Sequence, residues 1–154
     1  MRHKVVGRAG LFLAGVFLMA QLIRPDRTNP AGDPGAAVDA GGRLPSDVAA
    51  VFARSCYDCH SNATRWPWYS AVAPMSWGMV RHVTEGRHAL NFSTWGAYPA
   101  AQKAKKLDVM CDRVRKGEMP LPSYLLLHRG ARLSEADWHL ICDWSADEAD
   151  RISR

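Results

Sequence analysis

The chain has 154 residues, with 20 Lys and Arg against 15 Asp and Glu and a formal net charge of +5. Most of the excess positive charge lies in residues 1–27, so the rest of the chain is nearly neutral. A nucleic-acid-binding protein would need a basic surface on its folded domain, and we therefore expect no nucleic-acid partner. About 110 residues remain after a leader and a linker are set aside, which is enough for one compact domain.

The beginning of the chain has the pattern of an export signal. Basic residues are concentrated in Met1–Arg8, and no charge follows from Ala9 to Ile23. The best candidate for a cleavage site, Leu18-Met19-Ala20, lacks a small residue at its first position. We therefore expect residues 1–23 to form an uncleaved signal anchor or transmembrane helix, with the following domain outside the membrane. Cleavage would instead release the domain into the extracytoplasmic space.

Helical periodicity recurs along residues 46–154, which we expect to form a single domain. Before it, residues 24–45 are rich in Pro and Gly and have the composition of a linker. In the domain, the apolar spacing predicts helices over residues 46–55, 77–85, 101–116 and from residue 134 onward. Gly86 is expected to end the second helix, and Ser134 and Asp137 are expected to form a capping box for the last one. No stretch predicts a strand, so we expect an all-α fold.

The strongest motif is Cys56-Tyr57-Asp58-Cys59-His60, which has the C-x-x-C-H spacing of c-type haem attachment. Two thiols at this spacing can both reach the vinyl groups along one edge of a porphyrin. The histidine that follows can then bind the iron as the proximal axial ligand. We therefore expect one covalently attached haem c, held by Cys56, Cys59 and His60.

Two other kinds of site use paired cysteines. A structural zinc site needs four ligands, but the remaining cysteines, Cys111 and Cys142, are isolated in the sequence. A thioredoxin-type redox pair needs a βαβ context, and the flanks of the motif contain no alternating Val/Ile-rich run. Outside the cytoplasm, Cys111 and Cys142 can pair in a disulfide or stay as two separate buried residues, and we expect the second.

Residues 64–77 are dense in aromatic residues and proline, and the prolines exclude a continuous helix. A loop this apolar must lie against another part of the molecule. We expect Trp66, Trp68 and Tyr69 to contact a face of the haem. The same rings are equally compatible with an aromatic core cluster under a long loop. Trp77, at the start of the next expected helix, is expected to face inward.

The second axial ligand decides what the iron can do. We expect Met119 to fill this position, because it lies in an irregular segment with nearby prolines, between one helix and the C-terminal helix. The alternative role for Met119 is to fill a gap in the core. His82 is the main alternative ligand. The other rivals are His88, His128, Met75, Met79 and Met110.

These features resemble class I cytochromes c, in which a helix leads into C-x-x-C-H, a methionine-proline loop follows and a terminal helix closes the domain. The chain is more closely similar to the bacterial haem-binding domain family. The residues that carry this similarity are 23–30, Cys56–His60, Trp66–Ser70, Pro74, Trp77, His82-Val83, Gly86-Arg87, Leu90–Ser93, Trp95, Gly117–Pro120 and Tyr124. The resemblance implies a cytochrome c-like helical domain around one haem, with Phe52 on its first helix packing near Trp144 on its last.

No constellation of a general base and a nucleophile appears in the sequence, so we expect an electron carrier rather than an enzyme. The leading hypothesis is a membrane-tethered monohaem cytochrome that exchanges single electrons with extracytoplasmic redox proteins. Its haem domain would face the periplasm, and its N-terminal helix would lie in the bacterial inner membrane. The alternative is a haem-based sensor or small-ligand-binding protein with a displaceable distal ligand. A peroxidase would need an open site with an acid–base residue such as His82 or His128.

Overall fold

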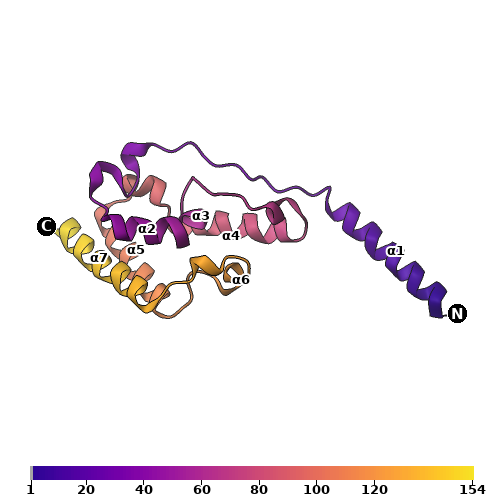
Figure 1. Cartoon of the computed structure of the whole chain (residues 1–154). Coiled ribbons are helices and arrows are strands. Elements are labelled where there is room, and N and C mark those ends of the chain that lie inside the picture. Colours follow the sequence, from indigo (N-terminus) through magenta and orange to yellow (C-terminus); the bar gives the residue numbers. More distant parts are fainter. Residues whose placement is uncertain (1) are drawn as a thin grey trace.

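The structure, a computed structural model, describes residues 2–154, with side chains from Val6 onward. The described chain is helical and contains no strand, which confirms the expected all-α class (Figure 1). Its α-helices are α1 Arg2–Ala20, α2 Ser46–Ser55, α3 Tyr57–His60, α4 Met75–Ala89, α5 Ala100–Arg115, α6 Pro122–Leu125 and α7 Glu135–Ser153. Short 3-10 helices are η1 Pro34–Ala36, η2 Ala40–Gly42, η3 Trp68–Ala71, η4 Phe92–Ala97 and η5 Arg129–Ala131.

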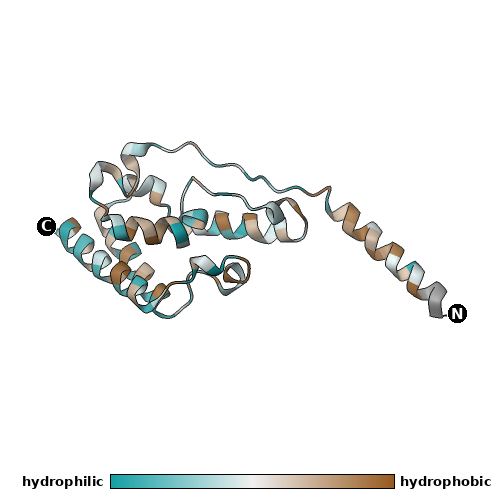
Figure 2. Cartoon of the chain, viewed as in Figure 1, coloured by the Kyte–Doolittle hydropathy of each residue, from teal (hydrophilic) through white to brown (hydrophobic). Residues whose placement is uncertain are grey.

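Helix α1 projects away from the rest of the molecule (Figure 1), and Figure 2 shows that it is largely apolar. Its apolar side chains are exposed, as shown by Leu11, which is 77% exposed. The chain just after α1 is held against the start of α4, because the Trp77 indole N–H donates to the Ile23 carbonyl at 2.9 Å. No helix in the described part of the chain is long and apolar enough to cross a membrane, so the structure does not support the span expected in residues 1–23.

The segment expected to be a linker is partly built into the domain. Val38 and Leu44 are buried in the main core. The backbone N–H of Val38 donates to the carbonyl of Phe92 at 2.9 Å, and η1 packs against η4. Part of residues 24–45 therefore belongs to the packed domain and is not a free spacer. A composition rich in Pro and Gly predicts irregular backbone, but single apolar side chains within it can still enter a core.

The main core forms between α2, α5 and α7. Its most buried side chains include Phe52, Leu107 and Ile141. The Phe52 ring stacks on Phe92, with 4.6 Å between centroids, and meets Trp144 edge-on at 5.4 Å. These geometries are favourable for aromatic pairs. The packing of the first domain helix against the last, which the cytochrome resemblance implies, is therefore confirmed.

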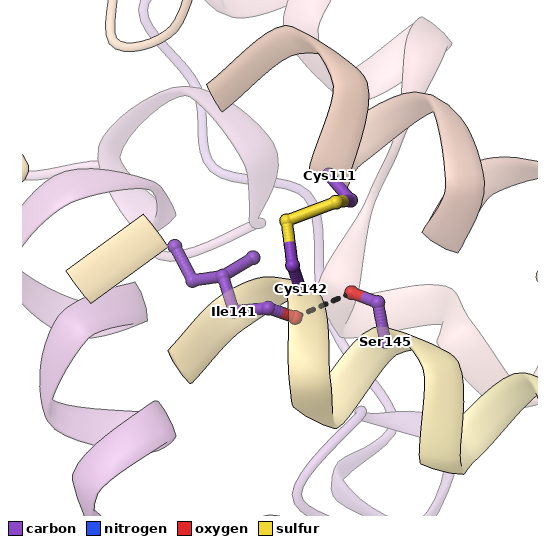
Figure 3. The surroundings of a disulfide bond; sticks show 4 residues. All are labelled: Cys111, Ile141, Cys142 and Ser145. Carbon is purple, nitrogen blue, oxygen red and sulfur yellow. Dashed lines mark hydrogen bonds between the residues drawn. A yellow bond between two sulfur atoms is a disulfide. The ribbon is translucent and has the colours of Figure 1, made fainter. Parts of the chain in front are cut away.

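Cys111 on α5 and Cys142 on α7 form a disulfide (Figure 3), so the expectation of two separate buried cysteines is wrong. The two helices pack along each other, and the Cα atoms of the two cysteines are 4.9 Å apart, which is a normal separation for a disulfide. Beside the bond, the Ser145 hydroxyl donates to the Ile141 carbonyl at 2.7 Å. The register between two helices is a tertiary property that the spacing of cysteines in a sequence does not reveal.

Helix α4 extends beyond the expected helix at both ends and continues through Gly86. Trp77 does not face inward as expected: it is 37% exposed, whereas Met79, another residue considered for the inward face, is buried. Gly86 does not end the helix, because its missing side chain lets α4 lie directly against the backbone of Cys59. This tertiary contact overrides the low helix propensity of glycine.

The start of α7 follows the prediction from the sequence. The Ser134 hydroxyl accepts a hydrogen bond from the Asp137 N–H at 3.2 Å, and the Asp137 carboxylate accepts one from the Ser134 N–H at 2.8 Å. This arrangement is the expected capping box. Asp137 also forms an ion pair with Arg54 at 2.8 Å. The pair joins the start of the last helix to the helix that leads into Cys56.

Candidate functional site

A cavity of about 690 Å³ opens within the domain. Cofactor and ligand sites commonly have volumes of roughly 300–1,000 Å³ and mostly apolar linings. One side of the cavity, here called the attachment wall, is formed by α3, α4 and the chain up to Phe92. The other side, the loop wall, is formed by α5 and by the segment from Met119 to Tyr124. Figure 1 shows α3 and α4 across from α6, which belongs to the loop wall.

His60 ends α3 and lines the attachment wall. Its Nδ1 lies 2.9 Å from the Gly86 carbonyl oxygen and 3.0 Å from the Leu90 carbonyl oxygen. Because both partners are acceptors, Nδ1 carries the proton, and Nε2 keeps the lone pair that can bind a metal. Burial lowers the pKa of His60 against the opposing effect of the two carbonyl hydrogen bonds, which favours an uncharged ring. The imidazole is therefore held in the tautomer and orientation of an axial ligand.

The attachment wall depends on a close approach between α3 and α4 at Gly86. A Cβ atom added to Gly86 would lie 2.6 Å from the carbonyl oxygen of Cys59 and 3.3 Å from its Cβ. Any larger residue must therefore push the turn Cys56–His60 away from α4. Since the Gly86 carbonyl also binds His60, the same glycine sets the distance of the turn and the orientation of the ligand.

Cys56 and Cys59 are free thiols that line the cavity beside His60. Burial raises the pKa of Cys56 to about 12, and burial with repulsion from Asp58 raises the pKa of Cys59 to about 11. A thioredoxin-type redox pair needs a thiolate with a lowered pKa, so this environment disfavours that function. Within residues 2–154, no group of three or more His, Cys, Asp or Glu side chains is arranged to hold a metal ion.

Arg87 joins the attachment wall to neighbouring segments, a role that residue patterns did not indicate. Its guanidinium donates to the Ser61 carbonyl at 2.8 Å, to the Thr64 hydroxyl at 2.8 Å and to the Asn29 side-chain oxygen at 2.7 Å. The Asn29 amide donates in turn to the Thr64 carbonyl at 2.9 Å. These bonds tie the loop after His60 to α4 and to residues 24–45, the segment that was expected to be a linker. Asn29 and Arg87 both lie in stretches that resemble the haem-binding family. This resemblance was the indication in the sequence that the two residues matter for the site.

On the loop wall, α5 ends in a Schellman motif. The Gly117 N–H donates to the Val114 carbonyl at 3.1 Å, and the Glu118 N–H donates to the Arg113 carbonyl at 3.0 Å. Gly117 has a φ of 68°, in the left-handed region that favours glycine. Arg113 and Glu118 also form an ion pair across the motif. Met119 follows at once, and it lines the cavity.

Met119 and His82, the two main candidates for the distal ligand, both line the cavity, but they lie on different walls. Met119 lies on the loop wall, whereas His82 lies on α4 one turn before Gly86, on the same wall as His60. Met79 lines the cavity from α4, and Met110 lines it from α5. The remaining rivals do not line the cavity: these are His88, His128 and Met75.

The rings expected to contact a haem face, Trp66, Trp68 and Tyr69, do not line this cavity. Trp68 is 78% exposed. Tyr69 is buried in a small second core, and Trp66 packs at its edge. This arrangement matches the alternative expectation for these rings, an aromatic core cluster under a long loop. Other aromatic side chains line the cavity: Phe92, whose centroid lies 6.5 Å from that of His60, and Tyr124. Phe92 lies in Leu90–Ser93, one of the stretches shared with the haem-binding family, and this was its signal in the sequence.

A partly buried imidazole whose Nδ1 is hydrogen-bonded to two carbonyls, two thiols at c-type spacing and a largely apolar cavity together fit a haem. The model of the family described as a haem-binding domain matches residues 15–147, and the chain belongs to this family. The class defined by the fold and the site is therefore an all-α haem-binding protein. No curated protein and no solved structure matches the chain.

Proposed function

We propose that the chain is a monohaem c-type cytochrome that transfers single electrons outside the cytoplasm. The observation that carries the proposal is the cavity that gathers Cys56, Cys59 and His60 on one wall and Met119 on the other. Haem bound there supplies one-electron chemistry: ferric iron takes one electron from a donor and ferrous iron returns it to an acceptor. The chain supplies the ligands, the apolar surroundings and the orientation that set the reduction potential.

Cys56 and Cys59 hold the haem covalently in this proposal. Each thiol would hold the haem through a thioether to one vinyl group, with the thiol hydrogen taken up by the neighbouring vinyl carbon. This addition consumes no oxidant or reductant. The position of both thiols beside the cavity and next to His60 supports it.

Met119 is the distal ligand in this proposal. His60 and a second residue would hold the iron between them. His82 shares α4 with Gly86, whose carbonyl binds His60, whereas Met119 comes from a separate segment of the cavity lining, which favours Met119. A thioether ligand raises the reduction potential relative to a second histidine.

We place the domain in the bacterial periplasm, attached to the inner membrane through its N-terminal segment. The disulfide between Cys111 and Cys142 supports an oxidising compartment, and the basic and apolar pattern of residues 1–23 supports export. A reporter that is active only after export, fused after Arg154, tests the compartment. Fractionation of membranes tests the attachment. An inactive reporter on a stably produced fusion would contradict export, and a fully soluble protein would contradict attachment.

Visible spectra of the ferric and ferrous holo-protein, with and without carbon monoxide, test the distal ligand. The wild type is expected to be six-coordinate and low-spin in both states and not to bind carbon monoxide readily. Met119→Ala is expected to become high-spin and to bind it. Met110→Ala and His82→Ala change other residues of the same cavity and are expected to keep the wild-type spectrum. If His82→Ala rather than Met119→Ala changes the spectrum, the distal ligand is His82.

Covalent attachment is tested separately by the double variant Cys56→Ala/Cys59→Ala. Haem is expected to remain on the denatured wild-type chain and to be lost from the denatured variant. Haem that stays on the denatured variant would contradict attachment through these thiols.

A haem-based sensor or small-ligand-binding protein is the second candidate function. The observation that favours it is the presence of His82 and Glu85 on the cavity wall, where they offer hydrogen-bonding groups to a small bound ligand. A wild-type ferrous protein that is high-spin and binds carbon monoxide readily would support this candidate over the electron carrier.

A further inference from the structure

Asp58 lies between the two cysteines of the attachment motif, and its side chain is held firmly. The backbone N–H and the Nε of Arg65 both donate to Asp58 Oδ1 at 3.1 Å, and a terminal guanidinium nitrogen donates to Oδ2 at 3.2 Å. The Asp58 side chain is 13% exposed, whereas that of Arg65 is 73% exposed. Arg65 therefore covers the carboxylate from the solvent side and fixes its orientation.

Tyr124 on α6 meets this carboxylate from the loop wall. Its hydroxyl donates to Asp58 Oδ2 at 3.0 Å, and the residue lines the cavity. Behind it, the ring of His128 stacks at 4.0 Å between centroids with an angle of 4° between planes. Burial and the neighbouring carboxylate raise the pKa of Tyr124, so its hydroxyl stays a protonated donor. The bond thus joins the loop wall to the turn that carries both thiols.

Met119 and Tyr124 belong to the same short segment after α5. The Schellman motif at Gly117 fixes the start of this segment. Packing also holds this segment, since Met119 contacts the main core and Tyr124 contacts the second core, and the Tyr124 hydroxyl adds a hydrogen bond from its far end to the turn that carries the thiols. We propose that Tyr124, through its hydrogen bond to Asp58, is a positioning residue that holds Met119 over the iron. This inference rests on the proposed function, because it concerns the segment that carries the distal ligand.

The test compares the wild-type holo-protein with Tyr124→Phe, which removes the hydroxyl and keeps the stacked ring. Imidazole is titrated into the ferric protein as a competitor for the position of Met119. Its affinity is expected to rise about tenfold to a hundredfold, the effect of losing a hydrogen bond to a charged group. The amount of covalent haem is expected to stay the same, and backbone amides of residues 118–125 are expected to exchange hydrogen faster.

The matched control is Tyr69→Phe. The Tyr69 hydroxyl lies 3.4 Å from His128 Nδ1 in the same aromatic cluster, but Tyr69 does not line the cavity. This variant is expected to keep the imidazole affinity of the wild type. An equal rise in Tyr69→Phe and Tyr124→Phe would overturn the proposal, because it would indicate general loosening of the cluster. Unchanged imidazole affinity in Tyr124→Phe would also overturn it when Met119 is the ligand.

Failure of the ligand assignment is distinguishable from failure of this inference. If Met119→Ala keeps the wild-type spectrum, Met119 is not the ligand, and hydrogen exchange in Tyr124→Phe decides alone whether Tyr124 anchors the segment. Faster exchange over residues 118–125 then supports the anchor. Unchanged exchange overturns it.

Discussion

The two walls of the cavity are held by different kinds of interaction. On the attachment wall, backbone groups do most of the holding: two carbonyls bind His60, and Gly86 touches the backbone of Cys59. On the loop wall, hydrogen bonds at the helix end near Gly117 and from Tyr124 hold the segment that carries Met119, together with packing of Met119 on the main core and of Tyr124 on the second core. The first wall is therefore held by close contacts between backbone groups, and the second by side-chain packing and a few hydrogen bonds.

This difference indicates where substitutions act. A change on the attachment wall disturbs contacts between packed elements and should lower the stability of the whole domain. A change in the segment from Met119 to Tyr124 should act mainly on how firmly Met119, the proposed distal ligand, is held. The wall that carries Cys56, Cys59 and His60 is thus held by more backbone contacts, and the segment that carries Met119 is the easier one to adjust.

The largest effect is expected from removing the disulfide under the loop wall. Cys111 and Cys142 are separated by 31 residues, and closing such a loop contributes about 3–4 kcal/mol to the free energy of unfolding. Cys111→Ala/Cys142→Ala should lose this amount in guanidinium denaturation, while haem stays attached through Cys56 and Cys59. A reductant should lower the stability of the wild type and leave the double variant unchanged. Equal stability of the variant and the oxidised wild type would contradict the prediction.

A second substitution tests the close contact of the attachment wall. Gly86→Ala places a methyl group against Cys59 and should lower the free energy of unfolding by about 1–3 kcal/mol, as overpacking does. It should also displace His60 and change the spectrum of the bound haem. Gly78→Ala on the same helix is the control, since a Cβ there meets nothing within 4 Å. It should stabilise the protein by up to about 1 kcal/mol. Equal stability of Gly86→Ala and Gly78→Ala in thermal unfolding would contradict the argument that Gly86 is in close contact with Cys59.

A smaller and more local effect is expected at the end of α5. Gly117→Ala puts a side chain on a residue with a φ of 68°, which should lower stability by about 1–2 kcal/mol. Gly117→Asn should lower it less, because Asn tolerates the left-handed region. Imidazole affinity of the ferric protein should rise in Gly117→Ala, since the segment carrying Met119 loses its fixed start. A rise in Gly117→Asn as large as that in Gly117→Ala would contradict this reasoning.

The smallest expected effect is a loss of stability at acidic pH that involves Asp137, a residue away from both walls of the cavity. Burial of Asp137 opposes its ionisation, but hydrogen bonds from Ser134 and the nearby Arg54 outweigh burial and hold the pKa of Asp137 below its usual value. A lowered pKa contributes stability above the unfolded-state value of about 4, and this contribution is lost as pH falls through the folded-state value. Asp137→Asn should therefore lose up to about 1 kcal/mol near neutral pH and little in acid. If the difference in free energy of unfolding between the wild type and Asp137→Asn stays constant as the pH falls below about 4, this assignment is refuted.

Much of the candidate site was predictable from local sequence. The thiols and imidazole of Cys56–His60 act from one turn of chain, so their spacing alone indicates their chemistry. Met119 was indicated by its irregular segment, and the cavity that it lines supports that choice. Phe92, Arg87 and Tyr124 were indicated only by the resemblance to the haem-binding family, because each acts through partners distant in the sequence.

Local sequence was enough to predict the all-α class, the capping box at Ser134 and the grouping of Cys56, Cys59 and His60, because each depends on residues within a few positions of one another. Tertiary structure alone decided the pairing of Cys111 with Cys142, the exposure of Trp77 and the passage of α4 through Gly86. It also decided which wall carries each candidate ligand. The physical reason is register: which faces of two distant helices meet is set by packing across the whole domain, and no local pattern contains that information.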